Sequence, residues 1–178
     1  KEDKTIEWDI SKLRKEIFRK KLCHITPEHY RDEIVDKAFE IFIAKRHEIK
    51  LFSGVKDSLK NLSKKYTLGV LTNGNADIYR FDIGRYFNFS ISSLEAKDSK
   101  PNRAHFDMAI SRVNNISFDN ILHIGDHQIN DIFCAYNLGI DTLWFNNNNV
   151  SWAQDFKKPD EFSSWHDLEQ IIRNKYER

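Results

Sequence analysis

The sequence predicts an α/β protein with a parallel sheet flanked by helices. From about residue 51 onward, short apolar runs alternate with segments whose apolar residues recur at helical spacing. This alternation is typical of parallel strands covered on both faces by helices. The first 50 residues contain no strand-like run and predict helices only. With 178 residues, 40% of them hydrophobic, the chain can form about one domain with a small appendage.

The first expected helix lies in "WDISKLRKEIFRKKL", where Ile10, Leu13 and Ile17 recur at helical spacing. Thr26-Pro27-Glu28 predicts the start of a second helix, with a capping hydroxyl, a proline in the first turn and an acid near the positive helix end. "HEIKLFSG" then predicts a linker. We therefore expect a helical unit at 1–50 and an α/β unit at 51–178.

In the α/β unit we expect helices at about 55–65, 103–114 and 130–138, the last ending at Gly139 as a C-cap. The expected strands are 66–72, 88–93, 121–126 and 141–146. Parallel sheets bind ligands beyond the carboxyl ends of their strands. The segments after Thr72, Ser93, Asp126 and Asn146 are therefore the places to search for a site.

Composition excludes several classes of partner. The net charge is +1, and acids interleave with the lysines at 12–21 and 56–65, so we expect neither a nucleic-acid nor a membrane partner. The two cysteines form no CxxC and the histidines no HExxH, which fits a reducing, cytoplasmic location. No apolar run reaches membrane-spanning length. The oligomeric state cannot be inferred.

Two of the segments that follow strands carry side chains suited to binding a phosphate group. In "LTNGN", Thr72 precedes Asn73-Gly74, and a hydroxyl beside free backbone N–H groups can hold an anion, although an ordinary turn has the same sequence. In "DSKPN", Lys100 precedes Pro101, which restricts its backbone. Its ammonium can neutralise a phosphoryl group or a carboxylate, or it is a surface lysine before a helix.

The third segment is "LHIGDHQIND", in which Asp126 follows a buried strand and Asp131 lies near a helix start. Two carboxylates on one loop suit Mg²⁺, but a turn former and a residue stabilising the helix end would have the same pattern. His123 is expected in the core and His127 in a solvent-facing loop. Together, the hydroxyl, ammonium and carboxylates would converge on one crevice and polarise a phosphoryl group.

This order of motifs resembles the haloacid dehalogenase-like (HAD) superfamily of phosphohydrolases over most of residues 51–172. The resemblance implies a Rossmann-like core, an Mg²⁺ cofactor and a small-molecule phosphate ester as substrate. "LTNGNA…SKP…LHIGD" is most similar to the bacterial branch that dephosphorylates FMN and 5-amino-6-(5-phosphoribitylamino)uracil. Residues 1–50 would form part of the cap that this family inserts after its first strand.

The resemblance also implies roles for single residues. Thr72 and Lys100 would bind the phosphoryl group with the Asn73-Gly74 turn. Asp126 would be a direct Mg²⁺ ligand, and Asp131 its acidic support.

The family's first motif, an Asp-x-Asp run after the first strand that supplies the nucleophile, is absent. "EWDIS" at 7–11 has no strand before it, and "FDIG" at 81–84 follows the second motif. By resemblance, the first strand lies between the strands ending at Thr72 and Asp126, so its absence leaves two unpaired edges and a gap. We therefore expect the sequence to be a fragment that is inactive alone.

Three alternatives stay open. A dehalogenase of the same superfamily needs no Mg²⁺, so EDTA would separate it from a phosphatase. A HAD-like module without a nucleophile would bind a phosphorylated ligand or a protein without turnover. A flavodoxin-like or response-regulator fold would match the sheet but leaves the Lys100 and Gly125-Asp126 combination unexplained.

Overall fold

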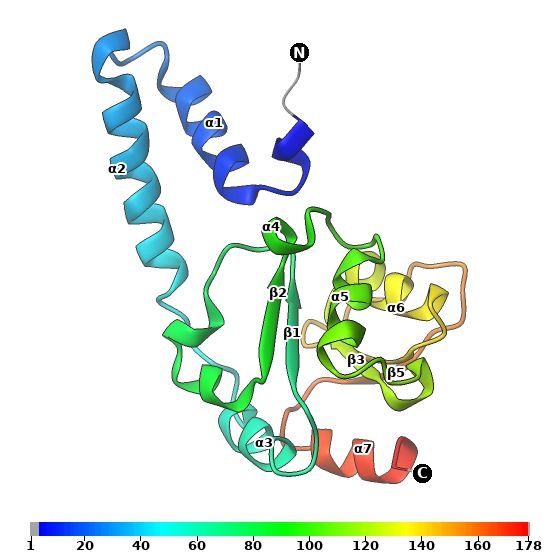
Figure 1. Ribbon diagram of the computed structural model, residues 1–178. Coiled ribbons are helices and arrows are strands. Elements are labelled where there is room, and N and C mark those ends of the chain that lie inside the picture. Colours follow the sequence, from blue (N-terminus) through cyan, green and yellow to red (C-terminus); the bar gives the residue numbers. More distant parts are fainter. Residues whose placement is uncertain (1–3, 178) are drawn as a thin grey trace.

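A computed structural model describes residues 4–177. The N-terminal part holds a short 3-10 helix η1 (Lys4–Glu7) and two α-helices, α1 (Ile10–Leu22) and α2 (Glu28–Arg46), which lie side by side as a hairpin (Figure 1). Phe18 packs edge-on against Phe42 at 6.0 Å between ring centroids, and Val35 is fully buried. Helices alone are therefore found where the sequence predicted them.

The helix starts differ in one detail from the prediction. Asp9 caps α1 by accepting the Lys12 N–H at 2.9 Å. The expected cap of α2 is wrong, because the Thr26 hydroxyl donates to Leu22 O at 2.8 Å and so terminates α1. Pro27 stands directly before the first helical residue, which places Thr26 one position too early to cap α2.

The α/β unit begins with α3 (Val55–Leu62) and β1 (Gly69–Thr72). Two 3-10 helices, η2 (Ile78–Arg80) and η3 (Asp82–Tyr86), lead to β2 (Phe89–Ser92). The two strands are parallel, with Gly69 opposite Phe89 and Thr72 opposite Ser92. The helices α4 (Ser93–Ala96) and α5 (Ala104–Arg112) follow.

The second half builds another parallel sheet, in the order β3-β4-β5. After the 3-10 helix η4 (Phe118–Asn120), β3 (Leu122–Gly125) leads into the π-helical η5 (Gln128–Phe133) and α6 (Cys134–Asn137). Gly139 ends this segment at φ 74°, as predicted. The chain continues through β4 (Asp141–Phe145), β5 (Asp160–Phe162) and α7 (Leu168–Lys175). The parallel α/β class is confirmed.

Apolar side chains hold these elements together in separate clusters. One cluster joins α3, β4 and α7 around Leu143 and Leu168, both fully buried. Another joins α5 and α6 around Phe106 and Ile140. Both clusters join elements from the two halves of the unit, because α3 packs with β4 and α7, and α5 packs with α6.

β1 and β3 face each other without pairing. Within residues 4–177 no ladder of hydrogen bonds joins the two sheets, and β1 and β2 stand apart from β3 in Figure 1. A cavity of about 1170 Å³ lies between them, lined by both strands along their whole length. The expected gap with two unpaired strand edges is therefore present.

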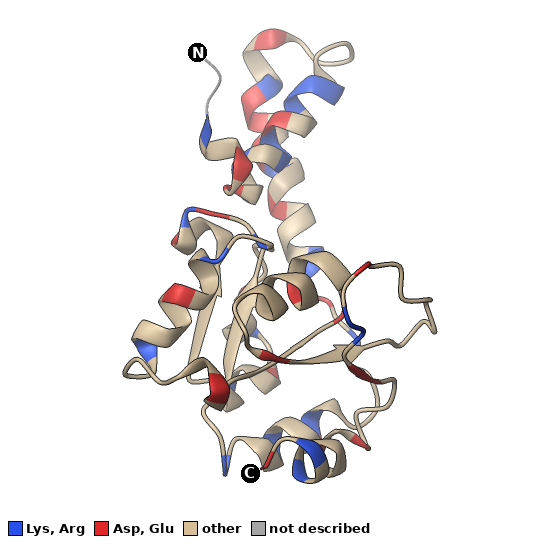
Figure 2. Cartoon of the chain, turned by 90° about the vertical axis from the view of Figure 1, so that its right-hand side faces the viewer, with Lys and Arg blue, Asp and Glu red and all other residues tan. Residues whose placement is uncertain are grey.

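Charges are mixed over the surface. Figure 2 shows acidic and basic positions interleaved along the helical hairpin, as the sequence predicted for its lysine-rich segments. No helix in residues 4–177 is both long and apolar enough to cross a membrane.

Candidate active site

Thr72 ends β1 in a tight turn at the mouth of the cavity. Its hydroxyl oxygen accepts the Gly74 N–H at 2.8 Å, and its carbonyl oxygen lies 3.2 Å from Nε2 of the buried His105. The Gly74 N–H is therefore already used, and the expectation that it is free for an anion is wrong. The hydroxyl itself can still donate its proton, because its hydrogen bond to Gly74 uses only a lone pair.

Asn73 connects this turn to the loop that holds Lys100. Its side-chain amide donates to Lys100 O at 2.8 Å and accepts the Lys100 N–H at 2.8 Å. The Asn73 side chain is thus committed to the Lys100 backbone. The first and second segments singled out in the sequence, "LTNGN" and "DSKPN", therefore lie at one place.

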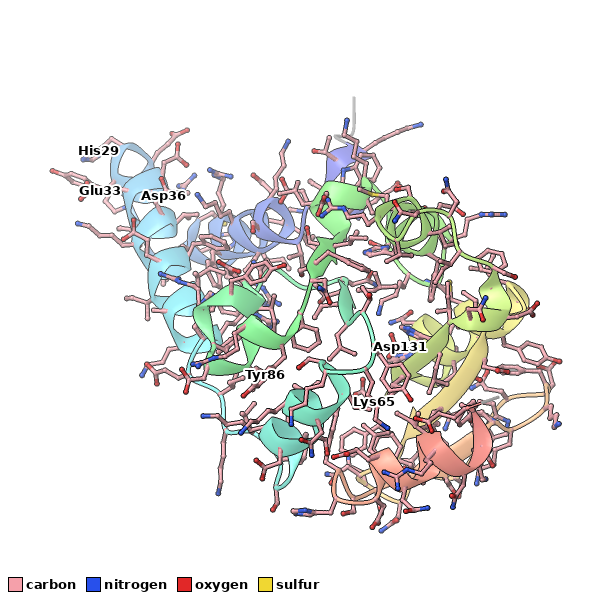
Figure 3. The ribbon with its side chains drawn as sticks, turned by 60° about the horizontal axis from the view of Figure 1, so that its bottom comes forward. His29, Glu33, Asp36, Lys65, Tyr86 and Asp131 are labelled. Atoms are coloured by element: carbon pink, nitrogen blue, oxygen red, sulfur yellow. The ribbon has the colours of Figure 1, made fainter. Side chains whose placement is uncertain are left out.

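Lys100 lies in a buried ion pair with Asp131. Its Nζ is 2.6 Å from Asp131 Oδ1 and donates to Leu71 O at 2.8 Å, and the two side chains are only 7% and 10% exposed. The other oxygen of Asp131 accepts the His127 N–H at 3.0 Å. Figure 3 shows Asp131 inside the core, whereas His29 and Glu33 project outward from α2. Asp131 therefore orients the lysine.

Burial opposes the ionisation of Asp131, yet the adjacent His123 ring and the Lys100 ammonium outweigh it and hold the pKa of Asp131 well below its usual value. Burial also lowers the pKa of His123, and Lys100 acts in the same direction. His123 packs edge-on against Phe106, as expected of a core residue. Its Nε2 stands 3.9 Å from Asp131 and has no hydrogen-bond partner in residues 4–177.

Asp126 leaves β3 beside this pair. Its side chain is exposed and lines the same cavity as Thr72 and Lys100, and its carbonyl oxygen accepts the Trp144 indole N–H at 2.9 Å. Gly125 is required before it, because a Cβ there would lie 2.3 Å from Asp131 Cβ. The Gly-Asp sequence thus lets Asp131 approach the strand while Asp126 turns toward the open end of the cavity.

His127 performs the capping that was one interpretation of Asp131. Its ring is exposed, and Nδ1 accepts the N–H groups of Ile129 and Asn130 at 3.2 and 3.1 Å. The Asp131 carboxylate therefore does not cap these N–H groups, and its Oδ1 pairs with the Lys100 ammonium.

The oxygen donors of the site can be compared with those that Mg²⁺ requires. No group of three or more His, Cys, Asp or Glu side chains that could hold a metal gathers anywhere in residues 4–177. Mg²⁺ nevertheless needs only one or two protein carboxylates and keeps several waters. The exposed Asp126 carboxylate fits that requirement as a direct ligand, with Asp131 behind it.

Arg46 is a site residue that sequence reasoning missed. It ends α2, yet its Nη2 lies 3.2 Å from the point where a Gly74 side chain would begin, and Thr72 Oγ1 lies 3.1 Å from the same point. A single arginine at the end of a helix gives no periodic or motif signal. Only the way α2 meets the α/β unit brings it to the Thr72 turn.

Comparison with known proteins identifies a matching hydrolase family and several similar phosphatases. Residues 3–145 match the family described as haloacid dehalogenase-like hydrolase. The 5-amino-6-(5-phospho-D-ribitylamino)uracil phosphatase YigB of Escherichia coli is 32% identical over 109 residues, covering 61% of this chain and 45% of YigB. The pyrimidine 5'-nucleotidase YjjG of the same organism is 24% identical over 154 residues, covering 84% of this chain and 65% of YjjG.

Among solved structures, a 2-haloacid dehalogenase from Pseudomonas syringae superposes with a TM-score of 0.85 at 30% identity, covering 97% of this chain and 75% of that one. YfnB from Bacillus subtilis, solved with magnesium bound, has a TM-score of 0.65 at 18% identity, which shows the shared fold only. The chain spans 45% and 65% of the lengths of YigB and YjjG.

Proposed function

The chain belongs to the haloacid dehalogenase-like hydrolase family, and from that premise we propose that it forms part of an Mg²⁺-dependent phosphatase of a small phosphate monoester. The observation that carries the proposal is the buried Lys100–Asp131 pair beside the Thr72 hydroxyl, at the carboxyl ends of β1 and β3. These groups suit a tetrahedral anion held at the cavity mouth. The phosphatase relatives support the same reaction class.

Lys100 retains capacity for a ligand. An ammonium has three N–H donors, and Leu71 O and Asp131 Oδ1 use two of them. The third can donate to a phosphoryl oxygen, together with the Thr72 hydroxyl. Asp126 would hold Mg²⁺, which when bound offsets negative charge on the phosphoryl group. The helical unit at 1–50 would act as a partial cap over the mouth.

The nucleophile has to come from elsewhere. The cavity between β1 and β3 has the two unpaired edges that one further parallel strand would satisfy. We propose that a segment outside these 178 residues fills it and supplies two carboxylates. In the chemistry that the family implies, one carboxylate attacks phosphorus to form an aspartyl-phosphate. The other protonates the departing alkoxide, then deprotonates the water that hydrolyses the intermediate.

Two features bear on the proposed substrate and on the proposed cellular location of the protein. The 32% identity to YigB favours 5-amino-6-(5-phospho-D-ribitylamino)uracil as the substrate, and FMN is the other substrate that the resemblance in the sequence implies. Cys23 and Cys134 are both free thiols, which fits the proposed cytoplasmic location.

A dehalogenase is the second candidate, favoured by the TM-score of 0.85 to the Pseudomonas syringae protein. The experiment assays the full gene product with p-nitrophenyl phosphate, FMN and 2-chloropropionate, with and without EDTA. We expect Mg²⁺-dependent phosphate release, its loss in Asp126→Asn, and no turnover by the 178-residue chain alone. EDTA-insensitive chloride release would establish the dehalogenase. Saturable phosphate binding without any turnover by the full product would establish a binding module.

A further inference from the structure

Arg46 is a cation without a partner, next to a turn that the proposed function gives to phosphate. Within residues 4–177 its side chain has no hydrogen bond and no ion pair, and its guanidinium lies over the Phe42 ring, with 5.9 Å between Cζ and the ring centroid. The preceding residue differs, because Lys45 is paired with Glu48 at 2.9 Å. Arg46 therefore keeps all five N–H donors of its guanidinium for a ligand.

The position of the guanidinium is defined from two sides. Nη2 and Thr72 Oγ1 both lie within 3.2 Å of the point where a Gly74 side chain would begin, so the absent side chain is what admits Arg46 to the turn. His47, the next residue, anchors the end of α2: its Nε2 accepts the Asp77 N–H at 3.0 Å and its Nδ1 lies 2.7 Å from Ile43 O. The end of α2 is thus fastened to the loop that follows Thr72.

The charges around the cavity mouth suggest a role for the Arg46 guanidinium. The Lys100 ammonium is neutralised by Asp131 at 2.6 Å, and the exposed Asp126 adds a negative charge at the same mouth. Mg²⁺ held by Asp126 would offset that carboxylate, but Lys100 is already neutralised, so a free cation beside the Thr72 turn would add attraction for a dianion. A guanidinium binds phosphate oxygens in a bidentate fork that an ammonium cannot reproduce.

We infer that Arg46 is a substrate-positioning residue that grips the phosphoryl group of the ester from the side of the helical hairpin. The inference rests on the proposed function, because it assumes that the Thr72 turn holds a phosphoryl group. It adds a ligand contributed by α2, so that binding of phosphate draws the hairpin onto the mouth of the site.

The test uses the full gene product and inorganic phosphate, with binding followed by ¹⁵N NMR titration in a buffer containing magnesium at fixed ionic strength. Arg46→Ala is expected to weaken phosphate binding roughly tenfold or more. Arg46→Lys should recover part of the loss, because it restores the charge without the fork. Lys45→Ala is the matched control, and should bind as the unaltered chain does. A merely structural Arg46 would give no such graded recovery.

Gly74→Ala tests the same geometry without touching the charge. Its new Cβ would lie 3.1 Å from Thr72 Oγ1 and 3.2 Å from Nη2, so both groups would have to shift by a few tenths of an ångström, and weaker phosphate binding is expected from a chain with an unchanged unfolding midpoint. Arg46→Ala binding phosphate as tightly as the unaltered chain, while Thr72→Val binds it weakly, would overturn the role of Arg46 and leave the phosphoryl site standing. No saturable binding by the unaltered chain would overturn both.

Discussion

Lys100 and Asp131 stand 31 residues apart in the sequence and form a buried ion pair with 2.6 Å between Nζ and Oδ1. The same ammonium donates to Leu71 O of β1, while Asp131 belongs to the segment that follows β3. The pair thus spans the two sheets at the end of the gap between them. Buried ion pairs contribute little net stability compared with apolar packing, but they select one arrangement. This one sets the relative position of the Thr72 turn and Asp126.

Removing the negative member should be costly. Asp131→Asn keeps the shape but leaves the Lys100 ammonium buried without a counter-charge, which destabilises proteins by about 3–5 kcal/mol. Urea unfolding followed by circular dichroism measures this loss. Asp126→Asn is the control, because that side chain is exposed and should change stability by less than about 0.5 kcal/mol. Equal stability of the two variants would contradict the importance of the pair.

The free energy of unfolding should decrease as the pH is lowered, in two separate pH ranges. Burial lowers the pKa values of His105 and His123 below the ordinary 6.5, so the unfolded chain binds protons first as the pH falls below about 6.5. The depressed pKa of Asp131 adds a second loss below about 3.8, where the unfolded carboxyl protonates and the native one does not. Each is a loss on acidification, because the unfolded state takes up more protons.

Urea midpoints at pH 8, 6 and 5 measure the first window. His105→Gln should flatten the decline, whereas His24→Gln, which alters an exposed residue, should leave it unchanged. A midpoint that is constant from pH 8 to pH 5 would show that the two buried rings take up protons to the same extent in the folded and the unfolded chain.

Much of this arrangement could be predicted because it is encoded locally. Helical spacing in 10–22 and apolar runs ending in Thr72 and Gly125-Asp126 fixed the elements and their chemistry, since parallel strands bring their carboxyl ends to one edge. β5 escaped prediction because Asp160–Phe162 is only 3 residues long and carries two acids. Arg46 and the clamp between Asn73 and Lys100 depend on tertiary contacts, which leave no periodic trace in the sequence.

Gly125 should tolerate no side chain. A Cβ at this position would lie 2.3 Å from Asp131 Cβ and 2.6 Å from Oδ2, so Gly125→Ala must move either β3 or the ion pair. Overpacking of this kind costs about 1–3 kcal/mol. Thermal unfolding gives the stability loss, and weakened phosphate binding by the folded variant would show that the pair itself has moved. An alanine variant matching the unaltered chain in both measurements would mean that Asp131 is not held against β3.

The unpaired edges of β1 and β3 make a prediction about hydrogen exchange. β4 is paired with β3 on one side and β5 on the other, so its amides should exchange slowly. In β1 and β3, alternate amides point into the 1170 Å³ cavity and should exchange much faster than the amides that form ladders. Amide exchange followed by NMR on the 178-residue chain measures the contrast directly. The same amides should become protected in the full gene product, because an added parallel strand would accept their hydrogen bonds. Fast exchange that persists in the full product would mean that no strand enters the cavity, and the source of the nucleophile would then have to be sought on another surface.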